Sequence, residues 1–175
     1  AGNTQLGWDN PPQLDDPATY AKTQLYMAYN LTIPGIPVIY YGNEVALTGA
    51  NDPDNRRPMV FGDDVSPDQQ RHFEAVQALI ALRNRHPAFR YGDLYPVYAG
   101  NDAICYSRTS LQERMLVCLN RGNYSQAIDV AWPRVFGNSQ LTPVYQAQEQ
   151  RVENASTVRI SLAPRAASVW RIEAR

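Results

Sequence analysis

The chain lacks several features that would point to a membrane or to a nucleic acid. No run approaches the ~20 apolar residues that a membrane span needs. Its 16 Lys and Arg residues nearly balance 17 Asp and Glu residues, so charge gives no reason to expect a nucleic acid or an anionic membrane as partner. The first ten residues, AGNTQLGWDN, contain neither the basic nor the apolar region of a signal peptide. We therefore expect a globular chain with no nucleic-acid or membrane partner, and the compartment stays open.

Cysteine is scarce, and the two that are present lie on neighbouring predicted strands. Cys105 and Cys118 are separated by a polar turn. If Arg108 faces Met115 across that turn, then Cys105 faces Cys118, so a cross-strand disulfide is one alternative. The alternative that we favour is a pair of small buried thiols that pack as hydrophobes.

The first half of the chain has the pattern of two helices around an apolar run. Asp16 and Pro17 predict the start of the first helix, with Asp as N-cap and Pro at the first helical position. The run at residues 36–41 is almost unbroken, which predicts a strand buried on both faces, as in a parallel sheet. Ser66, followed by Pro67 and Gln69, predicts a capping box that opens the second helix. Since one strand cannot form a parallel sheet, residues 1–91 are predicted to be the end of a larger domain.

From Gly92 onward the pattern changes to short runs rich in Val, Ile, Leu and Tyr, separated by turn residues. Their spacing of about ten residues and their alternation predict an antiparallel β-sandwich over residues 92–175. The predicted strands cover residues 94–98, 103–107, 115–119, 128–131, 141–145, 158–162 and 168–172.

Five segments together resemble a known family. Residues 33–44 and 49–59 read IPGIPVIYYGNE and GANDPDNRRPM, and they resemble the last barrel strand and its loop in the α-amylase superfamily, glycoside hydrolase family 13. The likeness is greatest to the cyclomaltodextrinase, neopullulanase and maltodextrin glucosidase group. The helix ending in ALIALRNRHPAFRYGD and the strands MLVCLNRGN and APRAASVWRIE are similar to the final barrel helix and the C-terminal sandwich of that family.

The resemblance implies a fold and a substrate. The fold is α/β plus all-β: the last helix–strand–helix portion of a (β/α)8 barrel in residues 1–91, then an antiparallel C-terminal β-sandwich in residues 92–175. Enzymes of this family cleave α-glucans with retention, which implies an α-glucan oligosaccharide as partner and no cofactor. Asp52 and Arg56 match the pair that hydrogen-bonds glucose units in the family, where a carboxylate accepts from sugar hydroxyls and a guanidinium donates.

Other residues of this region receive weaker assignments. We interpret Glu44 as structural, holding neighbouring loops. Tyr40 and Tyr41 are expected to pack in the barrel wall rather than to stack on sugar. Trp8, in a predicted loop, is an alternative stacking platform, although we do not favour that role. The two histidines, His72 and His86, are interpreted as surface or helix-capping residues.

Two further alternatives compete with the glycosidase interpretation. Asp52, Asp54 and Asn55 resemble an oxygen-rich calcium loop, but Arg57 stands where an EF-hand needs glycine, so we expect no metal. The sandwich could instead be a non-catalytic carbohydrate-binding or structural module. Trp132 and Trp170 fall in strand-like runs that suit a core, which favours the structural role.

We expect the chain by itself to be inactive. A retaining glycosidase needs two carboxyl groups about 5 Å apart, one of them kept protonated by its surroundings. The family carries them on earlier strands, so no catalytic residue is assigned here, and Asp52 and Asp54 are both expected to stay solvated and ionised. Leu25, Val38 and Ile39 should contact barrel elements outside this chain, which predicts exposed apolar surface and self-association.

Overall fold

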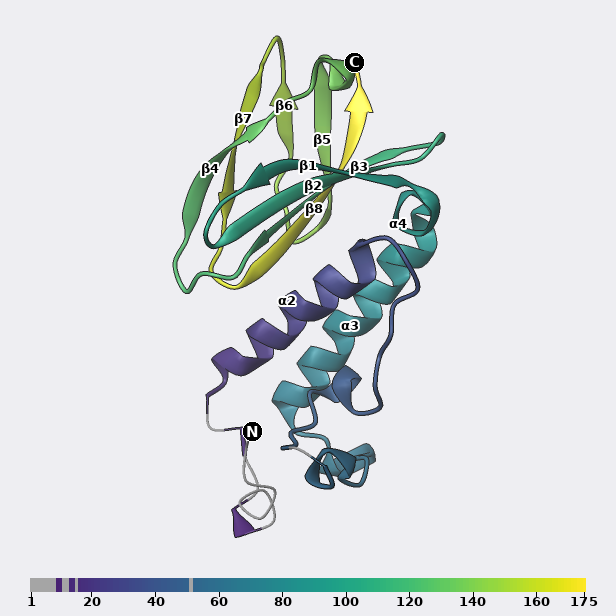
Figure 1. Cartoon of the computed structure of the whole chain (residues 1–175), viewed down its shortest axis with the longest axis vertical. Coiled ribbons are helices and arrows are strands. Elements are labelled where there is room, and N and C mark those ends of the chain that lie inside the picture. Colours follow the sequence, from purple (N-terminus) through teal and green to yellow (C-terminus); the bar gives the residue numbers. More distant parts are fainter. Residues whose placement is uncertain (1–8, 11–12, 15, 51) are drawn as a thin grey trace.

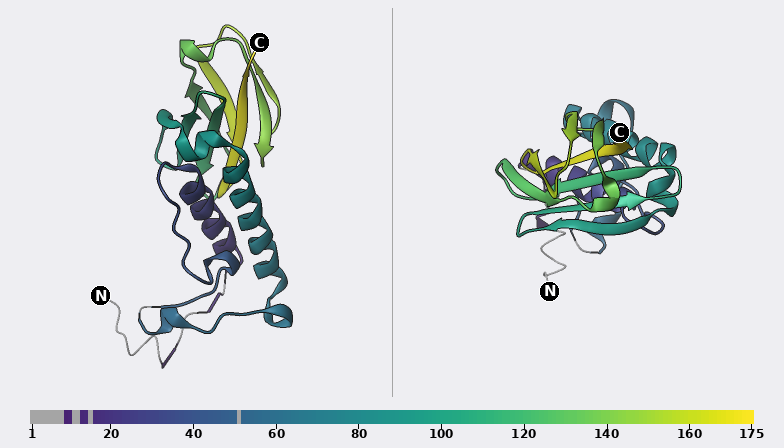
Figure 2. Two further views of the ribbon diagram at one scale, coloured as in Figure 1. Left: turned by 90° about the vertical axis from the view of Figure 1, so that its right-hand side faces the viewer. Right: turned by 90° about the horizontal axis from the view of Figure 1, so that it is seen from above.

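The structure, a computed structural model, describes residues 9–10, 13–14, 16–50 and 52–175 (Figure 1). A pair of long helices lies side by side at one end of the molecule, and two β-sheets lie at the other (Figure 2). The helices are α2 (Ala18–Thr32), α3 (Pro67–Arg85) and α4 (Pro87–Tyr91), with single turns of 3-10 helix at η1 (Asn43–Val45), η2 (Asp54–Arg56), η3 (Gly62–Asp64) and η4 (Arg134–Phe136). No helix in the described ranges is long and apolar enough to cross a membrane.

The strands form two antiparallel sheets. They are β1 (Asp93–Ala99), β2 (Ala103–Thr109), β3 (Arg114–Asn120), β4 (Gln126–Ala131), β5 (Ser139–Tyr145), β6 (Gln150–Val152), β7 (Thr157–Leu162) and β8 (Ala166–Ala174). The large sheet has the order β1-β2-β3-β8-β5-β6, and β4 pairs with β7 in a small sheet. The predicted antiparallel strands are therefore present, and β6 is an addition to them.

The core between the two sheets contains both predicted core tryptophans. Trp132 and Trp170 are 4% and 3% exposed, among aliphatic side chains from both sheets. Each indole N–H finds a backbone acceptor, Gly137 O at 3.0 Å and Gln148 O at 2.7 Å, so their burial leaves no polar group unsatisfied. The core interpretation of these two residues is confirmed.

Helices α2 and α3 cover the other face of the large sheet (Figure 1). Met27 and Leu31 of α2 pack in one cluster with Val76 and Leu79 of α3 and with sheet residues such as Val117. Strand β3 is consequently buried at nearly every position, whereas β4 and β7 alternate between buried and exposed residues because their outer face meets solvent. The large sheet is thus buried on both faces at its centre, along β3, whereas its edge strand β1 is mostly exposed.

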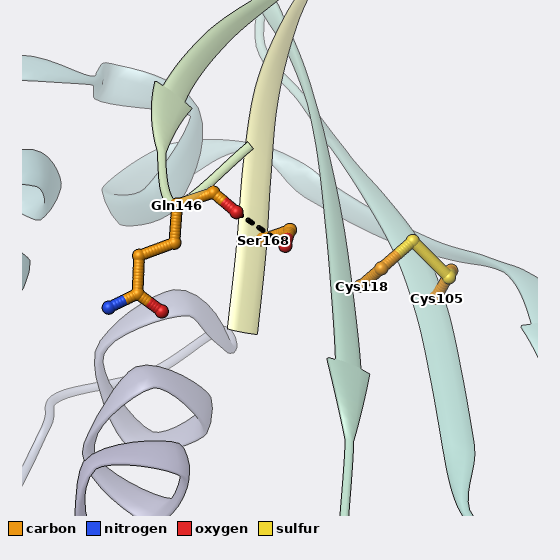
Figure 3. The surroundings of a disulfide bond; sticks show 4 residues. All are labelled: Cys105, Cys118, Gln146 and Ser168. Carbon is orange, nitrogen blue, oxygen red and sulfur yellow. Dashed lines mark hydrogen bonds between the residues drawn. A yellow bond between two sulfur atoms is a disulfide. The ribbon is translucent and has the colours of Figure 1, made fainter. Parts of the chain in front are cut away.

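Strands β2 and β3 have the register that the sequence suggested, and they carry a disulfide. Arg108 faces Met115 and Cys105 faces Cys118, whose Cα atoms are 4.2 Å apart and whose sulfur atoms are bonded (Figure 3). Both cysteines belong to the core between the sheets. The favoured interpretation as two unbonded thiols is wrong, because directly opposed residues on one face bring the sulfur atoms into bonding range.

The predicted strand at residues 36–41 is absent as a strand. Its residues are extended but belong to neither sheet, and Ile36 and Val38 are 92% and 75% exposed. One hydrogen bond, from Asn30 Nδ2 to Val38 O at 2.9 Å, holds the segment beside α2. An apolar run becomes a strand only when a neighbour completes its hydrogen bonds, and the described part of the chain supplies none.

The helix starts agree with the sequence signals. Ser66 and Gln69 form the complete capping box of α3, with Pro67 at the first position. Helix α2 begins at Ala18, whose backbone N–H donates to Asp16 Oδ1 at 2.9 Å. The carboxylate therefore satisfies a free amide of the first turn, as predicted, although the helix starts one residue later than expected.

Two buried arginines hold the C-terminal end of α2. Arg83 of α3 donates from Nη1 to Leu31 O at 2.8 Å and from Nη2 to Gly35 O at 2.6 Å. Arg108 of β2, with no exposed surface, donates to Thr32 O and also to Gly92 O at 2.9 Å. Positive groups are favourable here because the last carbonyls of a helix carry partial negative charge. One sheet residue thereby joins α2 to the connection between α4 and β1.

Candidate functional site

The polar loop between residues 42 and 57 lies at the end of the helices farthest from the sheets (Figure 2). A bidentate ion pair between Asp54 and Arg57 braces the loop from within. Arg57 Nε donates to Asp54 Oδ1 at 2.7 Å and Nη2 donates to Oδ2 at 2.8 Å. The brace also holds the neighbouring backbone, because the Ala50 N–H donates to Asp54 Oδ2 at 2.6 Å and Arg57 Nη1 donates to Thr48 Oγ1 at 2.7 Å. These contacts fix the loop's shape.

Asp54 is ionised but not solvated. Its side chain is only 12% exposed, so the expectation of a solvated carboxylate is wrong for this residue. Hydrogen bonds from Arg57 and from the Ala50 amide lower the pKa of Asp54, and the same pairing raises the pKa of Arg57. A carboxyl group held ionised by this pairing is unsuited to the role of a protonated general acid.

Asp52 and Arg56 stand on the outside of the braced loop. Their side chains are 67% and 59% exposed, and Arg56 Nη2 donates to Asp52 Oδ1. The pair leaves further carboxylate lone pairs and guanidinium N–H groups open to solvent. The structure therefore brings the two predicted ligand residues together in an accessible position. Whether they contact a ligand stays a prediction.

Tyr40 and Tyr41 lie beside this loop with their rings exposed. They are 48% and 42% exposed, and their ring centroids are 4.6 Å apart. Tyr41 Oη donates to Arg57 O at 3.1 Å, which ties the extended segment to the brace. The expected packing inside a barrel wall is not seen, because the described residues include no wall for the rings to join.

Glu44, in η1, has one carboxylate oxygen, Oε2, that is buried without a hydrogen-bond partner in the described part of the chain. Its predicted role in holding neighbouring loops stays a prediction. Trp8, the alternative stacking platform, lies outside the described residues.

His72 is a functional-site neighbour that sequence reasoning placed wrongly. The expectation was a surface or capping residue, but the side chain is fully buried where α3 meets η1. Its Nε2 is 3.0 Å from Asn43 O, and burial lowers the pKa of His72. The residue therefore supports the start of the polar loop from below. Its position four residues before Val76, on the apolar stripe of α3, is the sequence signal that this interpretation overlooked.

His86 stands at the junction of α3 and α4, as its interpretation as a helix-end residue predicted. Its partner was not foreseen. Glu113, from the turn before β3, lies with Oε2 at 2.8 Å from His86 Nδ1 and accepts from the Ala88 N–H at 3.0 Å through Oε1. The carboxylate thus occupies the N-terminal turn of α4 and links the helices to the sheet.

No group of three or more His, Cys, Asp or Glu side chains within the described ranges is arranged to hold a metal ion. The oxygen atoms of Asp54 that a calcium loop would use are instead taken by Arg57 and by a backbone amide. The chemistry that the loop offers is hydrogen bonding to a polar ligand, through Asp52 and Arg56.

No family model matches the chain, but it is similar in sequence and in structure to several enzymes. Cyclomaltodextrinase from Geobacillus thermopakistaniensis strain MAS1 is 31% identical over 154 residues, which are 87% of this chain and 25% of that enzyme. Neopullulanase 2 from Thermoactinomyces vulgaris is 34% identical over 124 residues, 69% of this chain and 21% of that enzyme. The α-amylase of Geobacillus thermoleovorans, solved with acarbose, superposes with a TM-score of 0.78 at 24% identity, over 98% of this chain and 36% of that structure.

The chain belongs to the α-amylase superfamily. It matches the C-terminal region of glycoside hydrolase family 13 enzymes, and the antiparallel sheets are consistent with the C-terminal sheet domain of these proteins. Further relatives at similar identity are named cyclomaltodextrin glucanotransferases, such as that of Geobacillus stearothermophilus, which is 32% identical over 85% of this chain and 21% of that enzyme. The chain spans about a quarter of the length of the cyclomaltodextrinase and just over a third of the α-amylase chain.

Proposed function

We propose that this chain is the C-terminal part of an α-glucan-hydrolysing glycosidase of the α-amylase superfamily. The parent enzyme cleaves α-1,4 glucosidic bonds with retention, and α-1,6 bonds are a second candidate substrate. Residues 1–91 complete its (β/α)8 barrel, and residues 92–175 form its C-terminal β-sandwich domain. Exposed Ile36 and Val38, in an extended segment between α2 and α3, support the barrel assignment because they fit a strand whose neighbours lie elsewhere in the parent.

The loop at residues 42–57 supplies one wall of the glucan cleft through Asp52 and Arg56. The observation that supports this role is that the loop contains two ion pairs, one largely buried and one exposed. Asp54 and Arg57 are largely buried and hold the backbone, whereas Asp52 and Arg56 are exposed and paired on top of it. A polar pair on a rigid support can meet two adjacent hydroxyl groups of a glucose unit with little loss of conformational entropy.

Substitution in the parent enzyme tests this role. Asp52→Ala or Arg56→Ala should lower kcat/KM for maltodextrin by roughly 10–150-fold, because one charged hydrogen-bond partner of the sugar is lost. Asp63→Ala is the matched control, since Asp63 is an exposed aspartate on η3 that the proposal does not use. Unchanged kinetics in both Asp52 and Arg56 variants, measured beside that control, would contradict the proposed subsite.

The isolated chain should release no reducing sugar from cyclodextrin, maltodextrin or pullulan. Among the residues that the structure describes, it contributes the braced loop, in which the ion pair with Arg57 makes Asp54 unsuited to be the protonated member of a catalytic carboxyl pair. Turnover by the purified chain above a buffer control would overturn the assignment of catalysis to the remainder of the parent.

The alternative function is a non-catalytic carbohydrate-binding or structural β-sandwich module. Burial of Trp132 and Trp170 in the core favours the structural form of this alternative, because neither ring is available to a sugar. The isolated chain should also self-associate through its exposed apolar segment around Val38, which is 75% exposed. Sedimentation velocity over a range of concentrations measures this, and a strictly monomeric species would contradict it.

A further inference from the structure

A groove of about 700 Å³ lies away from the polar loop, between helix α2 and the turns at one end of the sheets. Its helical wall is formed by Lys22, Leu25, Tyr26 and Tyr29. These positions are three and four residues apart, so they share one face of the helix. The opposite wall comes from the β1–β2, β3–β4 and β7–β8 turns. The volume is within the range of sites that hold small organic ligands.

The helical wall presents two aromatic rings to solvent. Tyr26 and Tyr29 are 57% and 44% exposed, and both line the groove. The groove is also lined by apolar side chains, Leu25 from the helical wall and Ile104 and Leu119 from the large sheet. Exposed aromatic side chains that adjoin other exposed apolar residues are a common mark of a binding site.

The opposite wall is polar and held in place by its own hydrogen bonds. The Arg121 N–H donates to Asp102 O at 2.8 Å and the Arg165 N–H donates to Gly122 O at 2.9 Å, so the three turns are joined to one another. Asp102 also accepts from Arg121 Nε at 3.3 Å and from Tyr124 Oη at 2.8 Å. The Arg121 side chain is nevertheless 74% exposed, which leaves its terminal N–H groups open to a ligand. A wall fixed before binding costs little to order.

We propose that this groove binds an α-glucan segment at a second site, separate from the pair formed by Asp52 and Arg56. A glucose ring has an apolar face of C–H groups and a rim of hydroxyl groups. The apolar face matches the rings of Tyr26 and Tyr29, and the hydroxyl rim matches the carboxylate of Asp102 and the guanidinium of Arg121. The choice of an α-glucan as occupant rests on the proposed function, and the groove itself rests on the contacts given above.

The test uses the complete 175-residue chain and maltoheptaose as the probe, with calorimetry at sugar concentrations up to about 10 mM. Replacing both groove tyrosines, Tyr26→Ala with Tyr29→Ala, should weaken binding by more than about tenfold. Tyr95→Ala is the matched control, because Tyr95 is 61% exposed on β1 and does not line the groove, and its affinity should equal that of the unmodified chain. None of these three substitutions removes a buried core side chain, and circular dichroism checks that each variant is folded.

A second pair of substitutions separates this proposal from the proposed function. In the Asp52→Ala, Arg56→Ala variant, groove binding should persist at the affinity of the unmodified chain. If that variant loses binding while the tyrosine variant keeps it, the loop site stands and the groove site is overturned. Absence of saturable binding by the unmodified chain also overturns the groove site. A third result would also overturn the groove site: the tyrosine variant keeps its affinity for the sugar but sediments differently. The groove would then bind a second copy of the chain.

Discussion

Replacing Arg108 by methionine should weaken the connection between α2 and the large sheet. The guanidinium group is fully buried and donates to Thr32 O, at the end of α2, and to Gly92 O, between α4 and β1. Methionine keeps most of the apolar stem but provides no donor, so both carbonyl groups lose a partner. Hydrogen bonds from charged donors contribute about 1.5–3 kcal/mol each, and the two together about 3–6 kcal/mol.

An opposing effect reduces this figure. Arg108 Nε is buried without an acceptor in the described part of the chain, and burial lowers the pKa of Arg108, so the charged group is held at a cost. Removing one unsatisfied donor regains about 1–3 kcal/mol. The loss outweighs the gain, because two acceptors are stranded and one orphan donor is removed. We expect a net decrease of about 2–4 kcal/mol in the free energy of unfolding, a large part of the stability of an ordinary domain.

Urea unfolding measures this change. The Arg108→Met midpoint should fall with an unchanged slope, whether unfolding is followed by helical circular dichroism or by tryptophan fluorescence. Arg159→Met is the matched control, because this strand arginine is 67% exposed and its side chain pairs with the similarly exposed Asp129. Its effect should stay below about 0.5 kcal/mol. The reasoning would be refuted if the two substitutions had equally small effects.

Two further predictions concern the connection before β1 and the support of the polar loop. Gly92→Ala should lower the free energy of unfolding by about 1–3 kcal/mol, because a Cβ there would lie 2.5 Å from Ala88 O and 2.7 Å from Thr109 O. The same urea assay measures this change. An unchanged midpoint would contradict the close approach of these atoms. For His72, burial lowers the pKa in the folded state, so the unfolded chain binds the proton more readily. Stability should therefore be complete above the ordinary pKa of about 6.5 and fall as the pH decreases below it. Unfolding free energies between pH 8 and pH 5 should show this slope, and His72→Gln should flatten it; an equal slope in the variant would assign it to other groups.

Local sequence signals predicted the elements whose partners are adjacent or whose pattern is complete in itself. Ser66 and Gln69 need only each other to cap α3, and the alternation in β7 already shows which residues face a core. Strand β6 (Gln150–Val152) carries no such signal. It is three residues long with two polar side chains, and it is a strand because it pairs with the first residues of β5.

The features that were missed depend on distant parts of the chain. The apolar run at residues 36–41 has the composition of a buried strand, but composition supplies no hydrogen-bond partner. Arg108 reads as an ordinary strand residue, and its acceptor on Thr32 is 76 positions away. His72 is buried by η1, a single turn whose position the helix pattern does not reveal. Asp52 and Arg56, by contrast, were assigned together because they match a pair in the resembled family, and they lie only four residues apart in the sequence.

The burial of β3 on both faces bears on how this architecture can be divided and reused. One face of β3 meets the core shared with β4 and β7, and the other meets α2 and α3. A cut at residue 92 would follow the change of pattern in the sequence, yet it would leave Tyr106, Met115 and Val117 facing water. A sandwich transplanted without its helices would therefore need a new cover for that face. Recombination or protein engineering that keeps this face covered would transfer α2 and α3 together with the strands.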